Sequence, residues 1–240
     1  MTEMVRRFLR QKFTNVGVLI ALSALALLAA LQLAASRGED GFAGVGYLAV
    51  LILSAACVSR DARSGALQMI LCRPIRRSAY VLGRYLGILA GSGVFFLAAV
   101  GLALLLAHVL PLTQDVSQPP MLGALARSAA GAFFSAAGMA ALILFLSVFL
   151  PGYGDALGYI LLAPLLSLPG LVAQFARVPA LDKAGKLLRD NLLPNPNWNS
   201  VLAGAHSLGE PVGRWLFALV AYVVLAIALF SRREFAYGQE

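Results

Sequence analysis

Charged side chains are scarce in this chain of 240 residues. Asp, Glu, Lys and Arg together make up 12% of the sequence, against about 25% in soluble domains. Hydrophobic residues make up 60%, and the mean hydropathy is +0.82. This composition excludes an ordinary soluble domain and predicts a polytopic membrane protein.

Residues that carry metal, redox or nucleotide chemistry are also rare. The chain has two cysteines and two histidines, and their spacing is typical of neither a zinc site nor a redox pair. Cys57 and Cys72 are predicted to be free thiols at the cytoplasmic side, where disulfides do not persist. No phosphate loop of the form GxxxxGKS or GxxxxGKT occurs. We therefore expect no metal or cofactor on this chain, and any ATP-driven work must come from a separate subunit.

The charge that is present is mostly of one sign. Lys and Arg total 19 and Asp and Glu total 11, which gives a net charge of +8. Nucleic-acid binding is one explanation of such an excess, but the basic residues lie in short segments beside long apolar runs. That distribution indicates membrane topology and contact with anionic lipid headgroups, and no nucleic-acid partner is expected.

Six apolar runs are candidates for membrane spans, because a bilayer core about 30 Å thick needs roughly 20 helical residues. They are residues 16–36, 42–59, 80–110, 121–150, 156–176 and 212–230. The longest connection, 177–211, is too short to form a sizeable soluble core. The sequence thus predicts an all-α membrane protein with a single transmembrane domain over residues 1–240.

The basic residues of the short loops predict the orientation of these spans. They gather at 6–12, 60–84 and 232–233, and six spans place all three segments on one side, which should be the cytoplasm together with both termini. The connection 177–211 is an exception, because it carries basic residues on the outer side. These are Arg177, Lys183, Lys186 and Arg189.

Residues 1–15 predict an amphipathic helix at the cytoplasmic membrane interface. Its apolar residues follow helical spacing and alternate with basic ones. The apolar residues are Met4, Val5, Phe8, Leu9 and Phe13. The apolar run that follows has about 21 residues, whereas the core of a signal peptide has about 7–15. We therefore expect a retained first span.

The predicted spans contain few ionisable residues. Arg84 and Arg127 lie near span ends, from which a long side chain reaches the headgroups, and Asp155 lies in a turn. Because ion-coupled transport usually needs charge near the midplane, these spans favour a hydrophobic or amphipathic cargo. An intramembrane serine protease is an alternative, with Ser92 and His206 as its minimum, although the small residues around Ser92 are typical of helix packing.

The stretch 59–87 has six arginines against one carboxylate, Asp61. Its first half predicts a short helix outside the bilayer, because Leu67, Ile70 and Leu71 share one helical face. Pro74 then disfavours further helix at the preceding residue. Periodicity alone leaves open whether this face binds a partner or rests on lipid.

This stretch resembles the connection between the second and third spans of ABC-2 type transporter permeases. The residues that carry the resemblance are Asp61, Gly65, Leu67, Leu71, Pro74, Arg76, Arg77, Tyr80, Gly83 and Arg84. The basic N-terminus, the six predicted spans and the ending at 230–235 are consistent with this family. Two positions depart from its pattern, since Ala66 stands where Thr is common and Gln68 where Glu is common.

The resemblance implies a coupling helix at 61–73, docked on a cytoplasmic ABC ATPase subunit that would bind ATP and Mg. The docking residues it implies are Asp61, Arg63, Gly65, Leu67, Gln68, Ile70, Leu71, Arg73, Pro74, Arg76 and Arg77. It also implies an exporter with a second permease copy, identical or related, in the bacterial inner membrane, and short outer helices within 177–211. An alternative within the same fold is a membrane scaffold or assembly subunit without transport of its own.

Overall fold

Every regular element in the described part of the chain is a helix. The computed structural model describes residues 2–35, 42, 44–58, 61, 76–109, 122–150, 153–176, 179–193, 196, 198–202, 204 and 209–232. The helices are α1 (Thr2–Phe13), α2 (Val16–Ala35), α3 (Val45–Ser54), α6 (Arg77–Val109), α7 (Leu122–Phe149), α8 (Gly154–Ala176), α9 (Pro179–Leu192), α10 (Trp198–Leu202) and α11 (Gly209–Arg232). The predicted all-α class is confirmed.

Four of these helices are long and apolar enough to cross a membrane, namely α2, α6, α7 and α11. Two other apolar stretches are shorter, α3 with 10 residues and Gly154–Leu166 within α8. The helix in the second predicted span is therefore shorter than 42–59. It ends there because Ala56 has a φ of +54°, in the left-handed region that breaks a right-handed helix.

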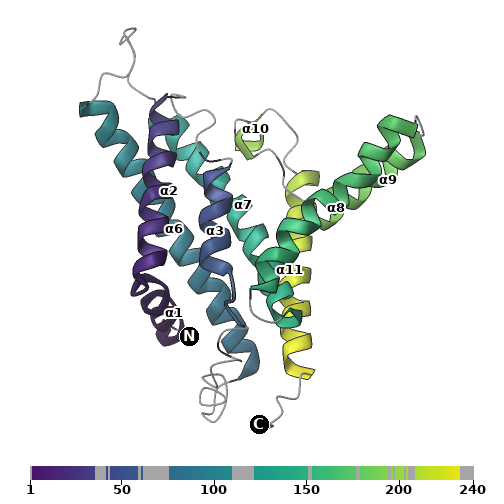
Figure 1. Cartoon of the computed structure of the whole chain (residues 1–240), viewed down its shortest axis with the longest axis horizontal. Coiled ribbons are helices and arrows are strands. Elements are labelled where there is room, and N and C mark those ends of the chain that lie inside the picture. Colours follow the sequence, from purple (N-terminus) through teal and green to yellow (C-terminus); the bar gives the residue numbers. More distant parts are fainter. Residues whose placement is uncertain are drawn as a thin grey trace.

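The long helices stand side by side, with α7 in contact with α3, α6, α8, α10 and α11 (Figure 1). The helices α8 and α9 contact each other along an arm that projects away from the other helices. The N-terminus, the start of α6 and the end of α11 lie at one end of the molecule, which we call the basal end. The short helix α10 lies near the opposite end.

The core is centred on the middle of α7, where a run of small residues is followed by branched apolar ones. Ala140, Ala141, Ile143 and Leu144 are fully enclosed, and Leu53 of the neighbouring α3 is equally buried. Small side chains let helix backbones approach closely. The described helices of the bundle are thus joined mainly by apolar packing, with polar contacts concentrated at the basal end.

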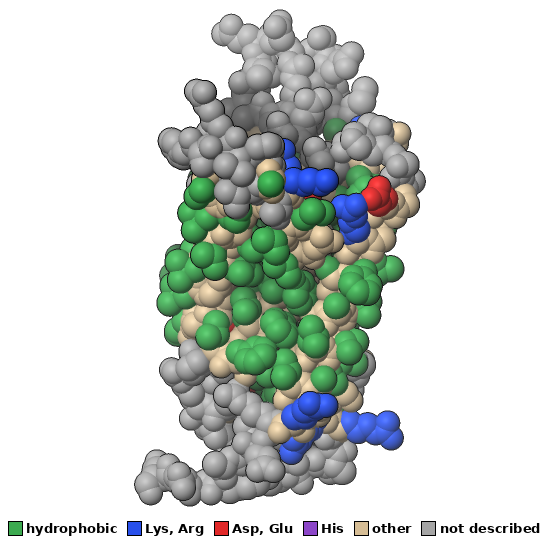
Figure 2. Space-filling view, turned by 90° about the vertical axis from the view of Figure 1, so that its right-hand side faces the viewer, with side chains coloured by type: hydrophobic (Ala, Val, Ile, Leu, Met, Phe, Trp, Pro, Cys, Tyr) green, Lys and Arg blue, Asp and Glu red, His purple; other side chains and the backbone are tan. Residues whose placement is uncertain are grey.

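Large apolar side chains also cover the outside of the molecule. Val16, Leu97 and Phe217 have exposed fractions of 68%, 74% and 77%. Figure 2 shows one face, on which a band of hydrophobic side chains lies between basic side chains near both ends. Exposing apolar surface to water is unfavourable by roughly 25 cal/mol per Å², so this band is suited to lipid. The chain is a membrane protein by these criteria.

An aromatic cluster fixes α10 onto the bundle. The rings of Trp198 in α10 and Trp215 in α11 have centroids 5.0 Å apart, and Phe134 of α7 lies 4.8 Å from Trp198. Both tryptophans are buried. The segment 177–211, in which short helices are predicted, contains the helices α9 and α10.

Candidate functional site

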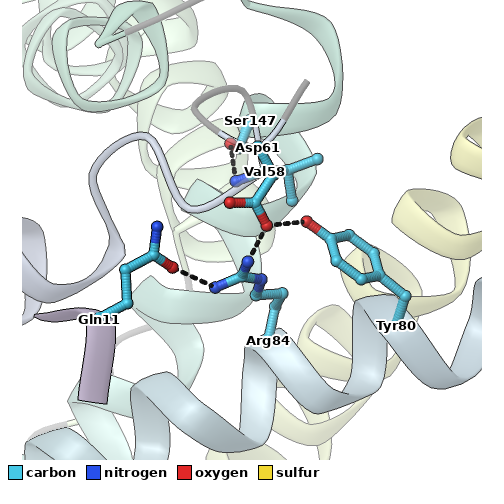
Figure 3. A network of polar contacts seen from close by, with 6 residues as sticks. All are labelled: Gln11, Val58, Asp61, Tyr80, Arg84 and Ser147. Carbon is cyan, nitrogen blue, oxygen red and sulfur yellow. Dashed lines mark hydrogen bonds and ion pairs between the residues drawn. The ribbon is translucent and has the colours of Figure 1, made fainter. Parts of the chain in front are cut away.

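Arg84 is the centre of a buried polar arrangement at the basal end (Figure 3). It lies near the start of α6 with an exposed fraction of 9%, and its guanidinium forms an ion pair with Asp61. One helical turn earlier, the Tyr80 hydroxyl donates a hydrogen bond to Oδ2 of Asp61 over 2.7 Å. A buried charge is tolerated only when it is paired and hydrogen-bonded. The burial of these three polar side chains is therefore tolerated because of the ion pair and the hydrogen bond between them.

The N-terminal helix α1 completes this arrangement. Gln11 accepts a hydrogen bond at Oε1 from Nη1 of Arg84 over 3.3 Å. The guanidinium carbon also lies 5.3 Å from the ring centroid of Phe8 and 5.4 Å from that of Tyr80, where cation–π attraction operates. We call Gln11, Asp61, Tyr80 and Arg84 the Arg84 cluster. It joins α1, Asp61 and α6 at a single guanidinium.

Glycines on α6 make room for α1. A Cβ added at Gly83 would lie 3.0 Å from Cβ of Met4, and one added at Gly87 would lie 2.5 Å from Cδ1 of Phe8. The Phe8 ring thus lies directly against the α6 backbone and is 1% exposed. The predicted N-terminal helix is confirmed, but its Phe8 face packs on protein rather than on lipid headgroups.

The turn after α3 is held by polar groups from three other helices. The backbone N–H of Ala56 donates to Oδ2 of Asp155 over 2.8 Å, and that of Val58 donates to Oγ of Ser147 over 3.2 Å. Lys12 Nζ donates to the C-cap carbonyl of α3 over 2.9 Å. A helix end leaves backbone groups without partners. Asp155, Ser147 and Lys12 satisfy several of them and so set the direction in which the chain leaves α3.

Cys57 lies in the same turn as a free, buried thiol. Cys57 has an exposed fraction of only 2%, so reagents in solution do not reach its sulfur. Buried structural cysteines are inert, and we expect the same of this thiol. The predicted free state of Cys57 is confirmed, whereas Cys72 lies outside the described residues.

The end of the last helix, α11, contacts the start of α6 at the basal end. The rings of Tyr80 and Phe230 stack with centroids 5.3 Å apart and planes 17° apart. Nη1 of Arg77 donates to the carbonyl of Ser231 over 2.8 Å. Asp61, which directly precedes the connection 62–75, is held by Arg84. Arg77, two residues after the end of this connection, contacts α11, so the chain is tied to the bundle on both sides of it.

The predicted docking residues separate into three groups. Asp61 is 3% exposed and faces Arg84, so its carboxylate lies inside the protein. Arg76 and Arg77 are exposed at the start of α6. The others lie outside the described residues, namely Arg63, Gly65, Leu67, Gln68, Ile70, Leu71, Arg73 and Pro74. The expectation that Arg84 extends to the headgroups is wrong, because its guanidinium is enclosed by Asp61, Phe8 and Tyr80.

Sequence reasoning did not find several residues of this site. The spacing of Gly83, Gly87 and Gly91 is a signal that it overlooked, because small residues four apart allow close helix contact. Gln11 and Ser147 carry no comparable signal, since each is an ordinary polar residue whose partner is distant in the sequence.

Two observations on the described residues concern metal binding and the protease alternative. The described residues contain no group of three or more His, Cys, Asp and Glu that could hold a metal ion. Ser92 is 1% exposed, and its hydroxyl donates to the Ile88 carbonyl of its own helix over 2.9 Å. His206 lies outside the described residues. The position of Ser92 favours a role in helix packing.

Comparison with models of known protein families and with curated protein sequences found no match. Support for a functional assignment therefore rests on the motif residues and on the geometry of the Arg84 cluster.

Replacing Ala56 with glycine is expected to stabilise the protein. Ala56 adopts a φ of +54°, a conformation unfavourable for residues with a Cβ but open to glycine, and relief of this strain should raise the free energy of unfolding by about 0.5–1 kcal/mol. Equilibrium unfolding in mixed micelles measures the change. Ala55→Gly is the control, because Ala55 has a φ of −53° and should gain nothing. Equal effects of the two substitutions would contradict the assigned turn.

Proposed function

We propose that this chain is the transmembrane permease subunit of an ABC-2 type ATP-binding cassette transporter. A separate cytoplasmic ATPase subunit binds ATP and Mg, and a second permease copy, identical or related, completes the pathway. The observation that carries the proposal is the meeting of Asp61, Tyr80 and Arg84 in one buried cluster. All three belong to the motif that resembles the family, and in the sequence they stand on either side of the connection 62–75.

A movement of the connection 62–75 would act on both α6 and α1. Asp61 immediately precedes it and is ion-paired with Arg84, so a displacement of Asp61 acts directly on α6. Through Gln11, the same guanidinium acts on α1. The apolar face of Leu67, Ile70 and Leu71 supplies the anchor that a helix-in-groove contact with the ATPase requires.

The proposed topology has six spans, formed by α2, α3, α6, α7, α8 and α11. The basal end is then cytoplasmic, because it holds the basic N-terminal helix, the start of α6 and the end of α11. The start of α6, which follows the connection 62–75 in the sequence, lies at this end, and in this proposal the cytoplasmic ATPase binds the connection from that side. In this proposal the protein lies in the bacterial inner membrane.

ATP binding in the ATPase subunits changes the exposure of a pathway between two permease copies. The cargo is hydrophobic or amphipathic, and its affinity must differ between the two states for the cycle to work. The distribution of charge supports this cargo class. Among the described residues, the buried charged side chains are Asp61, Arg84 and Asp155, which belong to the Arg84 cluster and to the contacts of the 55–58 turn.

Co-purification tests this function. Leu67→Asp with Leu71→Asp places two charges on the docking face and should abolish retention of the ATPase subunit by the permease. Thr14→Asp with Asn15→Asp is the matched control, because it adds the same charge to exposed residues beyond α1 and should leave retention unchanged. Retention of the ATPase by both variants would refute the docking role. ATP-dependent movement of cargo in reconstituted vesicles separates an exporter from a scaffold.

A further inference from the structure

An open groove lies along α1, next to α6. Its volume is about 750 Å³, within the range of about 300–1,000 Å³ found for ligand pockets. The lining combines two basic residues with mostly apolar ones. These residues are Thr2, Val5, Arg6, Leu9, Arg10, Phe13 and Leu86.

The two arginines of the groove differ from the other basic residues of α1. Arg7 forms an ion pair with Glu3 and does not line the groove. Lys12 is bonded to the C-cap carbonyl of α3. By contrast, neither Arg6 nor Arg10 has a carboxylate partner among the residues that the structure describes, and both are exposed. The groove therefore presents two positive charges available to an anion.

The remaining wall of the groove is apolar and continues toward surface suited to lipid. Leu9 and Phe13 are partly buried against the core, and Leu86 of α6 is 40% exposed. The next helix, α2, begins three residues after Phe13. Its residues Val16 and Ile20 have exposed fractions of 68% and 65%. An acyl chain lying on Phe13 and Leu86 would thus remain in contact with the hydrocarbon region.

From this combination we infer that the groove binds one anionic phospholipid. The phosphate of the headgroup lies between Arg6 and Arg10, and an acyl chain lies against Leu9, Phe13 and Leu86. A free phosphate would use the two arginines but leave the apolar wall uncovered. A neutral lipid would use the apolar wall but leave both guanidinium groups without an anion. The inference is independent of the transported cargo and of the ATPase subunit.

Such a lipid would lie against the face of α1 that lines the groove, next to Leu86 of α6, whereas the Phe8 side chain of α1 packs against Gly87. Each guanidinium near an anionic membrane surface contributes roughly 1 kcal/mol, which corresponds to about a fivefold change in affinity. Contact with both arginines should therefore make binding strongly selective for anionic headgroups.

Native mass spectrometry of the delipidated full-length chain tests the site. The probes are phosphatidylglycerol, phosphatidylcholine with the same acyl chains, and glycerol phosphate without chains. We expect phosphatidylglycerol to bind most tightly and Arg6→Gln or Arg10→Gln to weaken it about fivefold each. Arg7→Gln is the matched control, since it removes the same charge from the same helix outside the groove and should weaken binding less than twofold.

A second measurement locates the acyl chain. Phosphatidylglycerol with a photoreactive group in its chain should label peptides that contain Phe13 or Leu86, and Leu86→Gln should reduce this labelling. Equal weakening by all three arginine substitutions would show diffuse attraction and overturn the proposed site. Equal binding of phosphatidylcholine, full competition by glycerol phosphate, or crosslinking of a second copy across α1 in place of lipid would each overturn it as well.

Discussion

Asp61→Asn is expected to lower the free energy of unfolding by about 3–5 kcal/mol, because it leaves the guanidinium of Arg84 buried without a counter-charge. Arg84 and Asp61 have side-chain exposures of only 10% and 4%. Water therefore cannot replace the lost carboxylate. Equilibrium unfolding of the purified chain in mixed micelles measures the change.

An exposed pair in the same chain provides the control. Glu210 and Arg214 also form an ion pair, four residues apart on α11, but their side chains are 72% and 49% exposed. Exposed helical pairs contribute only about 0.3–0.5 kcal/mol, so Glu210→Gln should have little effect. Similar losses for Asp61→Asn and Glu210→Gln would show that Asp61 is not buried with Arg84.

A double substitution separates lost pairing from lost packing. A buried ion pair replaced by apolar residues of similar size is often neutral or even stabilising. Asp61→Leu with Arg84→Met should therefore recover much of the stability that Asp61→Asn loses. If the double variant keeps full stability but no longer transports in response to ATP, the Asp61–Arg84 ion pair serves to pass movement from the ATPase subunit to the helices and is not needed for folding.

Phe8→Ala is expected to lower the free energy of unfolding by about 3–5 kcal/mol, as for other enclosed aromatic residues. Phe8 is 1% exposed, packs against Gly87, and lies 5.3 Å from the guanidinium carbon of Arg84. Its removal leaves a cavity and one fewer aromatic face for the cation. The same unfolding measurement applies, with Phe217→Ala as the control, because Phe217 is 77% exposed. Equal losses for both variants would contradict the docking of α1.

A substitution on α6 also tests the contact between α1 and α6. Gly87→Ala places a methyl group 2.5 Å from the Phe8 ring, and such overpacking is unfavourable by about 1–3 kcal/mol. Gly101→Ala on the same helix meets no atom within 4 Å. It should be neutral or slightly stabilising, because alanine favours helix. Partial rescue of Gly87→Ala by Phe8→Leu would establish direct coupling between the two positions.

These contacts assign Asp61 a position different from the one that the motif suggests. The resemblance groups Asp61 with the residues that dock on a partner, whereas the structure encloses it with Arg84 and Tyr80. In the proposed transporter, Asp61 therefore passes movement from the docking segment to α6 and α1. Docking itself is left to the apolar face that includes Leu67 and Leu71.

Much of the fold was predictable from local patterns. The helices at 16–35, 77–109, 122–149 and 209–232 follow from apolar runs of spanning length, and α1 follows from its amphipathic spacing. These features depend on residues close together in the sequence. The early end of α3 was not predictable in this way, because residues 55–59 are themselves compatible with a helix. Asp155, about 100 residues away, bonds the turn instead.

The sequence by itself determined that the chain is helical, that it belongs in a membrane, and that its positive charge gathers beside apolar runs. It also placed Asp61, Tyr80 and Arg84 in one motif. Only the tertiary structure decided that Arg84 is buried, that Gln11 and Phe8 surround it, and that Arg6 and Arg10 remain open to an anion. The physical reason is that hydrophobicity acts residue by residue, whereas the pairing of a charge depends on which distant helices exclude water from it.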